Sequence, residues 1–315
     1  MNTLLNMKNV LGLFLILISS ITYAQDTIPS SVLNSMKFRN IGPAVTSGRI
    51  VDLATDPTDI NTYYVAAAYS GVWKTNNAGT TFKPIFDSYG TQSIGCVSID
   101  PNDHLKIWVG TGENNNQRSV GYGNGVYLSL NGGKSFKNMG LKESQHIGMI
   151  KIHPSNSNII YVAAYGPVWN KGGERGLYKT IDGGKNWERI KHVSEYTGCN
   201  EVHLDPNNPE IIYAAFHQRE RRQWTYMGGG PESGLFKSTD GGKTWKAINA
   251  GLPGGDKGRI AMCFAAQSSE KLYCMVETEG KAGGLFVSND KGESWSKTNG
   301  KYTSGNYYQE LMSDP

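Results

Sequence analysis

The sequence predicts an all-β protein with the architecture of a β-propeller, in which four-stranded blades repeat around an axis. Glycine accounts for 39 of the 315 residues and aromatic residues for 10 %, a composition typical of short strands joined by tight turns. One octapeptide occurs five times, at intervals of 50 to 58 residues. Each interval holds four short apolar runs separated by turn residues, as a propeller blade requires.

The first 24 residues have the pattern of a cleavable export signal and lie outside the fold. Lys8 precedes an apolar run at 10–21, and a possible cleavage site ends at Ala24. The run is shorter than the roughly 20 residues of a membrane span, and no second run follows. We therefore expect an exported protein without a membrane span. Residues 25–46 then form a lead-in segment, and 47–315 form the propeller.

Each interval divides into four strands, named A to D in chain order. In the first interval we expect strands at 49–54, 63–67, 72–74 and 82–85. An Asp-Pro pair or its equivalent forms the A–B turn, and the octapeptide forms the C–D turn. This layout gives five complete blades. Residues 307–312 then predict the inner strand of a sixth, so we expect the chain to continue into a larger propeller of seven or more blades.

The octapeptide has the pattern Ser/Thr-x-Asp/Asn-x-Gly-x-x-Trp/Phe, and its chemistry predicts a structural turn. The Asp or Asn side chain can accept hydrogen bonds from backbone N–H groups, and the glycine supplies a positive φ. Five copies in equivalent turns indicate a folding device rather than a catalytic carboxylate. The residues at the Asp/Asn position are Asn77, Asn131, Asp182, Asp240 and Asp290.

Charge and cysteine content exclude several classes of function. The formal net charge is only +4 and no Lys/Arg block occurs, so the sequence does not predict nucleic-acid binding. The four cysteines have no metal-binding spacing, and no metal or cofactor is predicted. Cys263 and Cys274 could bridge across a hairpin in an exported protein. Alternatively, all four are buried free thiols.

The octapeptides resemble the Asp-box, or BNR, repeats of bacterial sialidases, xyloglucanase-type glycosidases and sortilin-type propellers. Segments 38–43, 110–114 and 230–234 also resemble the start of large secreted bacterial proteins of the sortilin N-terminal or BNR glycosyl-hydrolase-like kind. The resemblance covers essentially the whole mature chain. It implies a bacterial protein that is secreted, periplasmic or on the cell surface, and whose function is ligand binding or glycoside hydrolysis.

The enzymatic implications depend on single positions. The Phe/Tyr-Arg-Ile-Pro motif of the sialidases is interrupted after Arg39, and Ala68 stands where the xyloglucanase-like propellers carry a catalytic Asp. A glycoside hydrolase needs two carboxyl groups facing one bond. These departures favour a binding module over an enzyme, although hydrolysis stays open as an alternative.

The B–C connections are long in three blades, and we call residues 110–125, 163–176 and 215–234 the B–C loops. Long loops at one end of a rigid scaffold commonly carry binding sites. Arginine and aromatic residues there suit a carboxylate, a phosphate or a sugar ring. The candidates are Arg219, Arg221, Arg222, Trp224 and Tyr226, with Arg118, Trp169 and Arg175 as weaker ones. Alternatively, these arginines pair with Glu113, Glu174, Glu220 or Glu232 to order the loops.

Two further carboxylates, Asp52 and Glu201, occupy the same position in strand A, the innermost strand of a blade. Arg49 and Arg259 are possible partners, so either a structural ion pair or a site in the central channel fits. With Glu113, these two acids are the candidates for catalysis. The preferred hypothesis is a module that binds an extracellular protein, peptide or glycan; the alternatives are a glycoside hydrolase and a scaffold portion of a larger secreted protein.

Overall fold

The computed structural model describes residues 31, 48–266, 268–301, 307 and 309–314. The predicted export signal, Arg39 and nearly all of the lead-in segment lie outside these residues. The chain divides into two units, Met1–Ala44 and Val45–Pro315. The second unit is described below, and the secondary structure of its described residues consists of strands apart from one 3-10 turn at Lys142–Ser144.

The strands of this unit form five four-stranded antiparallel sheets and one small hairpin. Blade 1 contains β1 (Ile50–Asp56), β2 (Asp59–Ala67), β3 (Gly71–Thr75) and β4 (Lys83–Pro84); blade 2 contains β5 (Ile94–Asp100), β6 (Asp103–Thr111), β7 (Val126–Ser129) and β8 (Lys137–Asn138). Blade 3 contains β9 (Ile147–His153), β10 (Asn156–Ala164), β11 (Gly176–Thr180) and β12 (Glu188–Lys191). Blade 4 contains β13 (Thr197–Leu204), β14 (Ile212–Gln218), β17 (Gly234–Ser238) and β18 (Lys246–Ala247); blade 5 contains β19 (Lys257–Ala265), β20 (Ser268–Thr278), β21 (Gly284–Ser288) and β22 (Ser296–Asn299). The hairpin, β15 (Glu220–Arg221) and β16 (Tyr226–Met227), lies within the third B–C loop.

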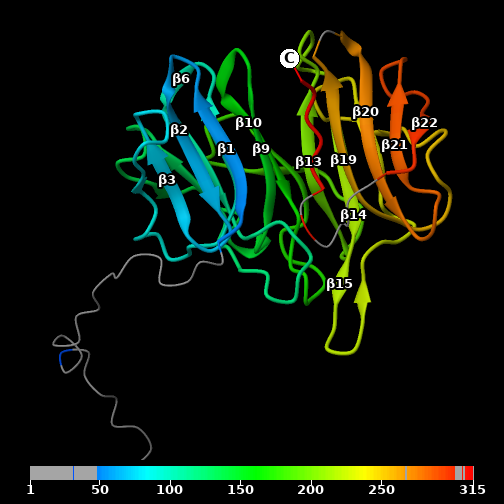
Figure 1. Ribbon diagram of the computed structural model, residues 1–315, viewed down its shortest axis with the longest axis horizontal. Helices are drawn as coiled ribbons and strands as arrows, with labels where there is room; N and C mark the ends of the chain where they lie inside the picture. The colour runs from blue at the N-terminus through cyan, green and yellow to red at the C-terminus, as the bar shows by residue number, and fades with distance from the viewer. Residues whose placement is uncertain (1–30, 32–47, 267, 302–306, 308, 315) are drawn as a thin grey trace, which may run out of the picture. The chain divides into compact units, whose positions relative to one another are not determined.

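The predicted blade architecture is confirmed, and consecutive blades pack face to face (Figure 1). Their first strands follow one another in the order β1, β5, β9, β13 and β19, and adjacent members of this series are in contact. Four apolar clusters fill the spaces between blades 1 and 2, 2 and 3, 3 and 4, and 4 and 5. The core is therefore a series of interblade layers, which explains why both faces of each strand B are apolar.

Each interblade layer contains the aromatic residue at one equivalent position of strand B, at most 1 % exposed. The four residues are Tyr64, Trp108, Tyr161 and Tyr213. In blade 1, the Tyr64 hydroxyl and Lys74 Nζ both donate to the carbonyl oxygen of Gly132 in the next octapeptide, at 3.1 and 3.0 Å. The same two donors in blade 4 reach Lys291 O. The octapeptides of blades 2 and 5 are thus part of the contact with the preceding blade.

The octapeptide turns have the predicted hydrogen bonds. In blade 3, Thr180 Oγ1 accepts the Gly184 N–H at 3.0 Å and donates to Asp182 Oδ1 at 2.7 Å. Asp182 Oδ1 also accepts the Asn186 N–H at 3.0 Å. Equivalent bonds occur in the other four turns. Hydrogen bonds from Asn186 lower the pKa of Asp182 well below its usual range, consistent with a structural carboxylate.

One sequence-based expectation requires correction, and the structure decides between two alternatives for the cysteines. Residues 309–314 form no strand, although an inner strand was expected at 307–312. The side chain of Gln309 instead binds blade 5. Its Nε2 donates to the carbonyl oxygens of Arg259 and Met275 at 2.8 Å each. Cys263 and Cys274 form no disulfide. Cys263 pairs with Tyr273 in the β19–β20 register, so the thiols of Cys263 and Cys274 belong to opposite faces of the sheet.

Candidate functional site

Three arginines, two from the B–C loop of blade 4 and one from β19 of blade 5, donate to three consecutive carbonyl groups of the blade 2 loop. We call residues Asn114–Asn116 the asparagine segment. Arg259 Nη1 donates to Asn114 O at 2.7 Å, Arg219 Nη1 to Asn115 O at 2.8 Å, and Arg221 Nε to Asn116 O at 2.6 Å. Arg219 Nη1 also reaches Asn116 Oδ1 at 2.6 Å. The segment is thereby fixed to blades 4 and 5.

Burial removes three predicted ligand contacts from the accessible surface. Arg219 is fully buried with its guanidinium 3.3 Å from the centre of the Tyr165 ring, and burial lowers its pKa to about 10. Arg221 is also buried, and Arg175 donates to carbonyl groups of its own loop, including Gly172 O at 2.9 Å. These side chains order the loops, as the alternative interpretation held, but their partners are chiefly carbonyl groups rather than the expected glutamates.

The expected glutamate pairing occurs elsewhere in the loops. Arg222 Nε donates to Glu220 Oε1 at 3.1 Å. Buried Glu113 accepts a hydrogen bond of 2.8 Å from Arg49 Nε, which links the asparagine segment to the start of blade 1. Glu232 instead accepts hydrogen bonds from the hydroxyl groups of Ser194 and Thr197.

The β15–β16 hairpin presents the most accessible of the predicted contacts. It projects from blade 4, as the strand labelled β15 in Figure 1 indicates. Residues 222–225 form its exposed tip, and Trp224 is 77 % exposed. At the base, the Arg221 guanidinium lies 4.2 Å from the centre of the Tyr226 ring. Exposed Arg118 and half-buried Trp169 lie in the other two loops.

Two exposed aromatic residues were missed by the sequence reasoning. Tyr69, in the short β2–β3 connection, is 39 % exposed, and Tyr122, in the blade 2 loop, is 52 % exposed. Neither lies in a cluster of aromatic and basic residues along the sequence, so only their position in B–C connections could have indicated them. Ala68, which the resemblance to xyloglucanase-like propellers aligns with a catalytic Asp of those enzymes, is fully buried, and its N–H donates to Arg49 O at 2.9 Å.

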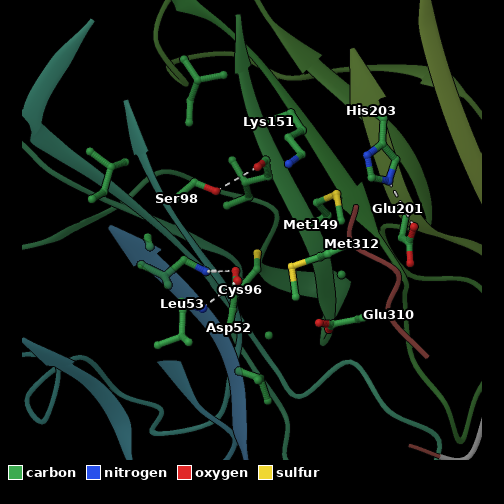
Figure 2. Close-up of a pocket in the computed structure, with 18 of the residues that line it drawn as sticks. Asp52, Leu53, Cys96, Ser98, Met149, Lys151, Glu201, His203, Glu310 and Met312 are labelled. Carbon is green, nitrogen blue, oxygen red and sulfur yellow. Dashed lines mark hydrogen bonds and ion pairs between the residues drawn. The ribbon is translucent and has the colours of Figure 1, made fainter. Parts of the chain in front are cut away.

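The first strands of the blades line a cavity of about 540 Å³, which includes Asp52 and Glu201 (Figure 2). Each carboxylate accepts a backbone N–H from the next first strand. Asp52 Oδ2 accepts from Val97 N and Glu201 Oε2 from Met262 N, both at 2.9 Å. Glu201 also contacts His203 Nε2 at 3.1 Å. The predicted partners Arg49 and Arg259 were wrong, because both bind the asparagine segment or its neighbour Glu113.

A third carboxylate in this cavity, Glu310, was also missed. It lies four residues before Asp314, the same spacing that singled out Asp52 and Glu201, so the sequence contained the signal. Figure 2 shows Glu310 between those two carboxylates in this view. Burial raises the pKa of Glu310 to about 7; Arg259 opposes this effect, whereas Asp52 and Glu201 add to it.

Comparison with known proteins decides the family. The Sortilin-Vps10 family, described as sortilin, neurotensin receptor 3, matches residues 124–282, just over half of the chain. The chain belongs to the Sortilin-Vps10 family. The match contains the octapeptides of blades 2, 3 and 4 and all of the hairpin.

Relatives of this Sortilin-Vps10 chain include xyloglucanases. A xyloglucanase of Hypocrea jecorina is 24 % identical over 255 residues, covering 72 % of this chain and 28 % of the relative. Xyloglucanase Xgh74A of Acetivibrio thermocellus is 22 % identical over 276 residues, with coverage of 78 % and 31 %. The crystal structure of an ancestral GH74 enzyme matches with a TM-score of 0.62 and 20 % identity, covering 84 % and 33 %. This chain thus spans about a third of their lengths.

The described part of this Sortilin-Vps10 chain contains no group of three or more His, Cys, Asp or Glu side chains that could hold a metal ion. Within the same residues, no helix is long and apolar enough to cross a membrane. The candidate site consists of the aromatic and basic side chains on the B–C loops and the carboxylates of the cavity.

Proposed function

We propose that this protein is an exported β-propeller that binds an extracellular glycan at the end of the propeller formed by the B–C loops. The observation that carries the proposal is Trp224, 77 % exposed at the tip of a hairpin whose base is held by buried hydrogen bonds. Flat aromatic surfaces suit the apolar faces of sugar rings, and a fixed presentation reduces the entropy lost on binding.

The names of two relatives support a glycan ligand. Both are xyloglucanases, and solved GH74 propellers share the fold of this one. Ala68 and the occupied carboxylates favour binding without hydrolysis, because Asp52 and Glu201 accept backbone hydrogen bonds and Glu113 is paired with Arg49.

Affinity electrophoresis against soluble xyloglucan, mixed-linkage glucan, arabinoxylan and pectin tests the proposal. We expect at least one polysaccharide to retard the wild-type protein and Trp224→Ala to abolish most of that retardation. Ile181→Ala is the matched control, because Ile181 is 72 % exposed but lies in an octapeptide turn. No retardation by any polysaccharide, or equal retardation of wild type and Trp224→Ala, would overturn it. Release of reducing ends in the same mixtures would instead support the hydrolase.

A further inference from the structure

A second pair of exposed aromatic rings lies where the B–C connections of blades 1 and 2 meet. Tyr69 and Tyr122 are 39 % and 52 % exposed. The two connections pack directly on each other, because a Cβ atom built on Gly121 would lie only 2.9 Å from Tyr69 Cε1. The position of Tyr69 is thus set by the residue next to Tyr122.

Polar groups surround both rings. The Arg49 guanidinium carbon lies 6.0 Å from the centre of the Tyr69 ring. The Tyr122 ring lies 5.7 Å from the His146 ring, and Tyr122 O accepts a hydrogen bond of 2.8 Å from Thr91 Oγ1. These contacts fix the backbone and one side of each ring, while a substantial part of the ring surface stays accessible to solvent.

Such a surface matches the chemistry of a sugar ring. A pyranose offers an apolar C–H face to an aromatic ring and hydroxyl groups at its edge to nearby donors and acceptors. An apolar peptide side chain would instead gain most from a concave pocket that removes it from water. Tyr69 and Tyr122 are both exposed, and Tyr69 lies beside the charged pair Arg49–Glu113, which favours the sugar.

The two aromatic regions are connected through the asparagine segment. Arg49, near Tyr69, pairs with Glu113, the residue that precedes this segment. At its other end, the Asn116 carbonyl holds Arg221 at the base of the hairpin that carries Trp224. The side chain of Arg49, beside Tyr69, and the base of the hairpin are therefore held by neighbouring residues of one loop.

We propose that Tyr69 and Tyr122 form a second sugar contact, so that the ligand is a polysaccharide chain long enough to reach both this pair and Trp224. The inference rests on the proposed function and specifies its ligand as a polymer. A chain that reaches both contacts binds more tightly than a short oligosaccharide, because the second contact forms within the complex.

A length series tests this inference. Calorimetry would use the polysaccharide of the panel that binds wild type, together with its oligosaccharides from the disaccharide upward. We expect wild-type affinity to rise with chain length and then level off. Tyr69→Ala and Tyr122→Ala should each weaken binding of the long chain by about tenfold and leave the disaccharide bound at Trp224 nearly unchanged. Ile181→Ala should match wild type throughout.

Gly121→Ala provides an independent perturbation, because its Cβ would displace the Tyr69 ring and also lie 2.6 Å from Ser93 Oγ. It should weaken long-chain binding while thermal unfolding reports whether the fold is retained. If Tyr69→Ala and Tyr122→Ala bind every length as wild type does, but Trp224→Ala does not bind, this inference fails and the proposed function stands. If Trp224→Ala also binds normally, both fail.

Discussion

Two consecutive residues of each octapeptide turn have positive φ. The second is always glycine, with φ between 84° and 95°; the residue before it is glycine in three blades. Ala78 and Lys291 occupy this first position in blades 1 and 5, with φ of 54° and 58°. A side chain in this left-handed region costs roughly 1–2 kcal/mol, so these two positions are strained.

Lys291→Gly is expected to stabilise the protein by about 0.5–1 kcal/mol, because the relief of strain exceeds the added flexibility of the unfolded chain. The carbonyl oxygen of residue 291 still accepts hydrogen bonds from Tyr213 and Lys237. Urea unfolding measures the change. Lys185→Gly, at an exposed position of the blade 3 turn outside the positive-φ pair, is the control and should be neutral or destabilising. Lower stability of Lys291→Gly would contradict the argument.

Because of the octapeptide carboxylates, we expect the stability of the folded protein to depend on pH. Hydrogen bonds from Ser294 and Ser288 lower the pKa of Asp290 to about 2. A folded-state pKa below the unfolded value contributes stability above the unfolded pKa, and this contribution is lost as pH falls through the folded pKa. Asp290→Asn, which copies Asn77 and Asn131, should flatten the loss of stability between about pH 4 and pH 2.

Acid unfolding followed by circular dichroism measures this effect, and Asn131→Asp is the reciprocal control. This variant should make the dependence steeper, because it adds a titrating carboxylate to the same hydrogen bonds. Identical pH profiles for wild type and both variants would show that the turn carboxylates do not contribute.

At the scale of the blade, the aromatic residue of strand B joins one sheet to the next turn. Where this residue is a tyrosine, its hydroxyl has a hydrogen-bond partner in some layers and not in others. The Tyr64 hydroxyl donates to Gly132 O, whereas the equally buried Tyr161 hydroxyl has no hydrogen-bond partner in the described part of the chain. A buried hydroxyl without a partner is unfavourable, and a satisfied one contributes about 1 kcal/mol.

Tyr64→Phe should therefore destabilise the protein by about 1 kcal/mol, whereas Tyr161→Phe should be neutral or slightly stabilising. The two substitutions remove the same atom from equivalent positions, so each serves as the control for the other. Chemical denaturation of both variants measures the difference. Equal losses would mean that the Tyr161 hydroxyl is satisfied in solution.

The structural elements that could be predicted from the sequence are those stabilised by contacts between residues close together in the chain. The octapeptide turns form their hydrogen bonds within five residues, so the structural role of Asp182 could be predicted from the pattern alone. Arg219 could not be assigned this way, because its carbonyl partner on Asn115 lies 104 residues away. Arginines beside aromatic residues look alike in a sequence whether they bind a ligand or buried carbonyl groups.

Across the whole molecule, all four cysteine thiols are buried away from solvent. Cys96, Cys199, Cys263 and Cys274 are all buried and free, and burial raises the pKa of each. A neutral buried thiol reacts slowly with disulfide reagents.

We therefore expect no thiol to react with Ellman's reagent in the native protein at neutral pH, and all four to react after unfolding in urea. Reductant should leave thermal stability unchanged. Rapid reaction of the native protein, or fewer than four thiols after unfolding, would contradict the burial of these groups.

The arginine bonds to the asparagine segment also set an order of assembly. Arg259 and Asn114 are 145 residues apart in the sequence. During translation, blade 2 therefore emerges from the ribosome well before blade 5. The first blade interfaces can form early, but Asn114 receives its last donor only when β19 has emerged. Closing so long a loop is slow compared with forming a hairpin. The end of the propeller that carries Trp224 should therefore become rigid last, and a nascent chain should gain its binding competence only after the fifth blade has folded.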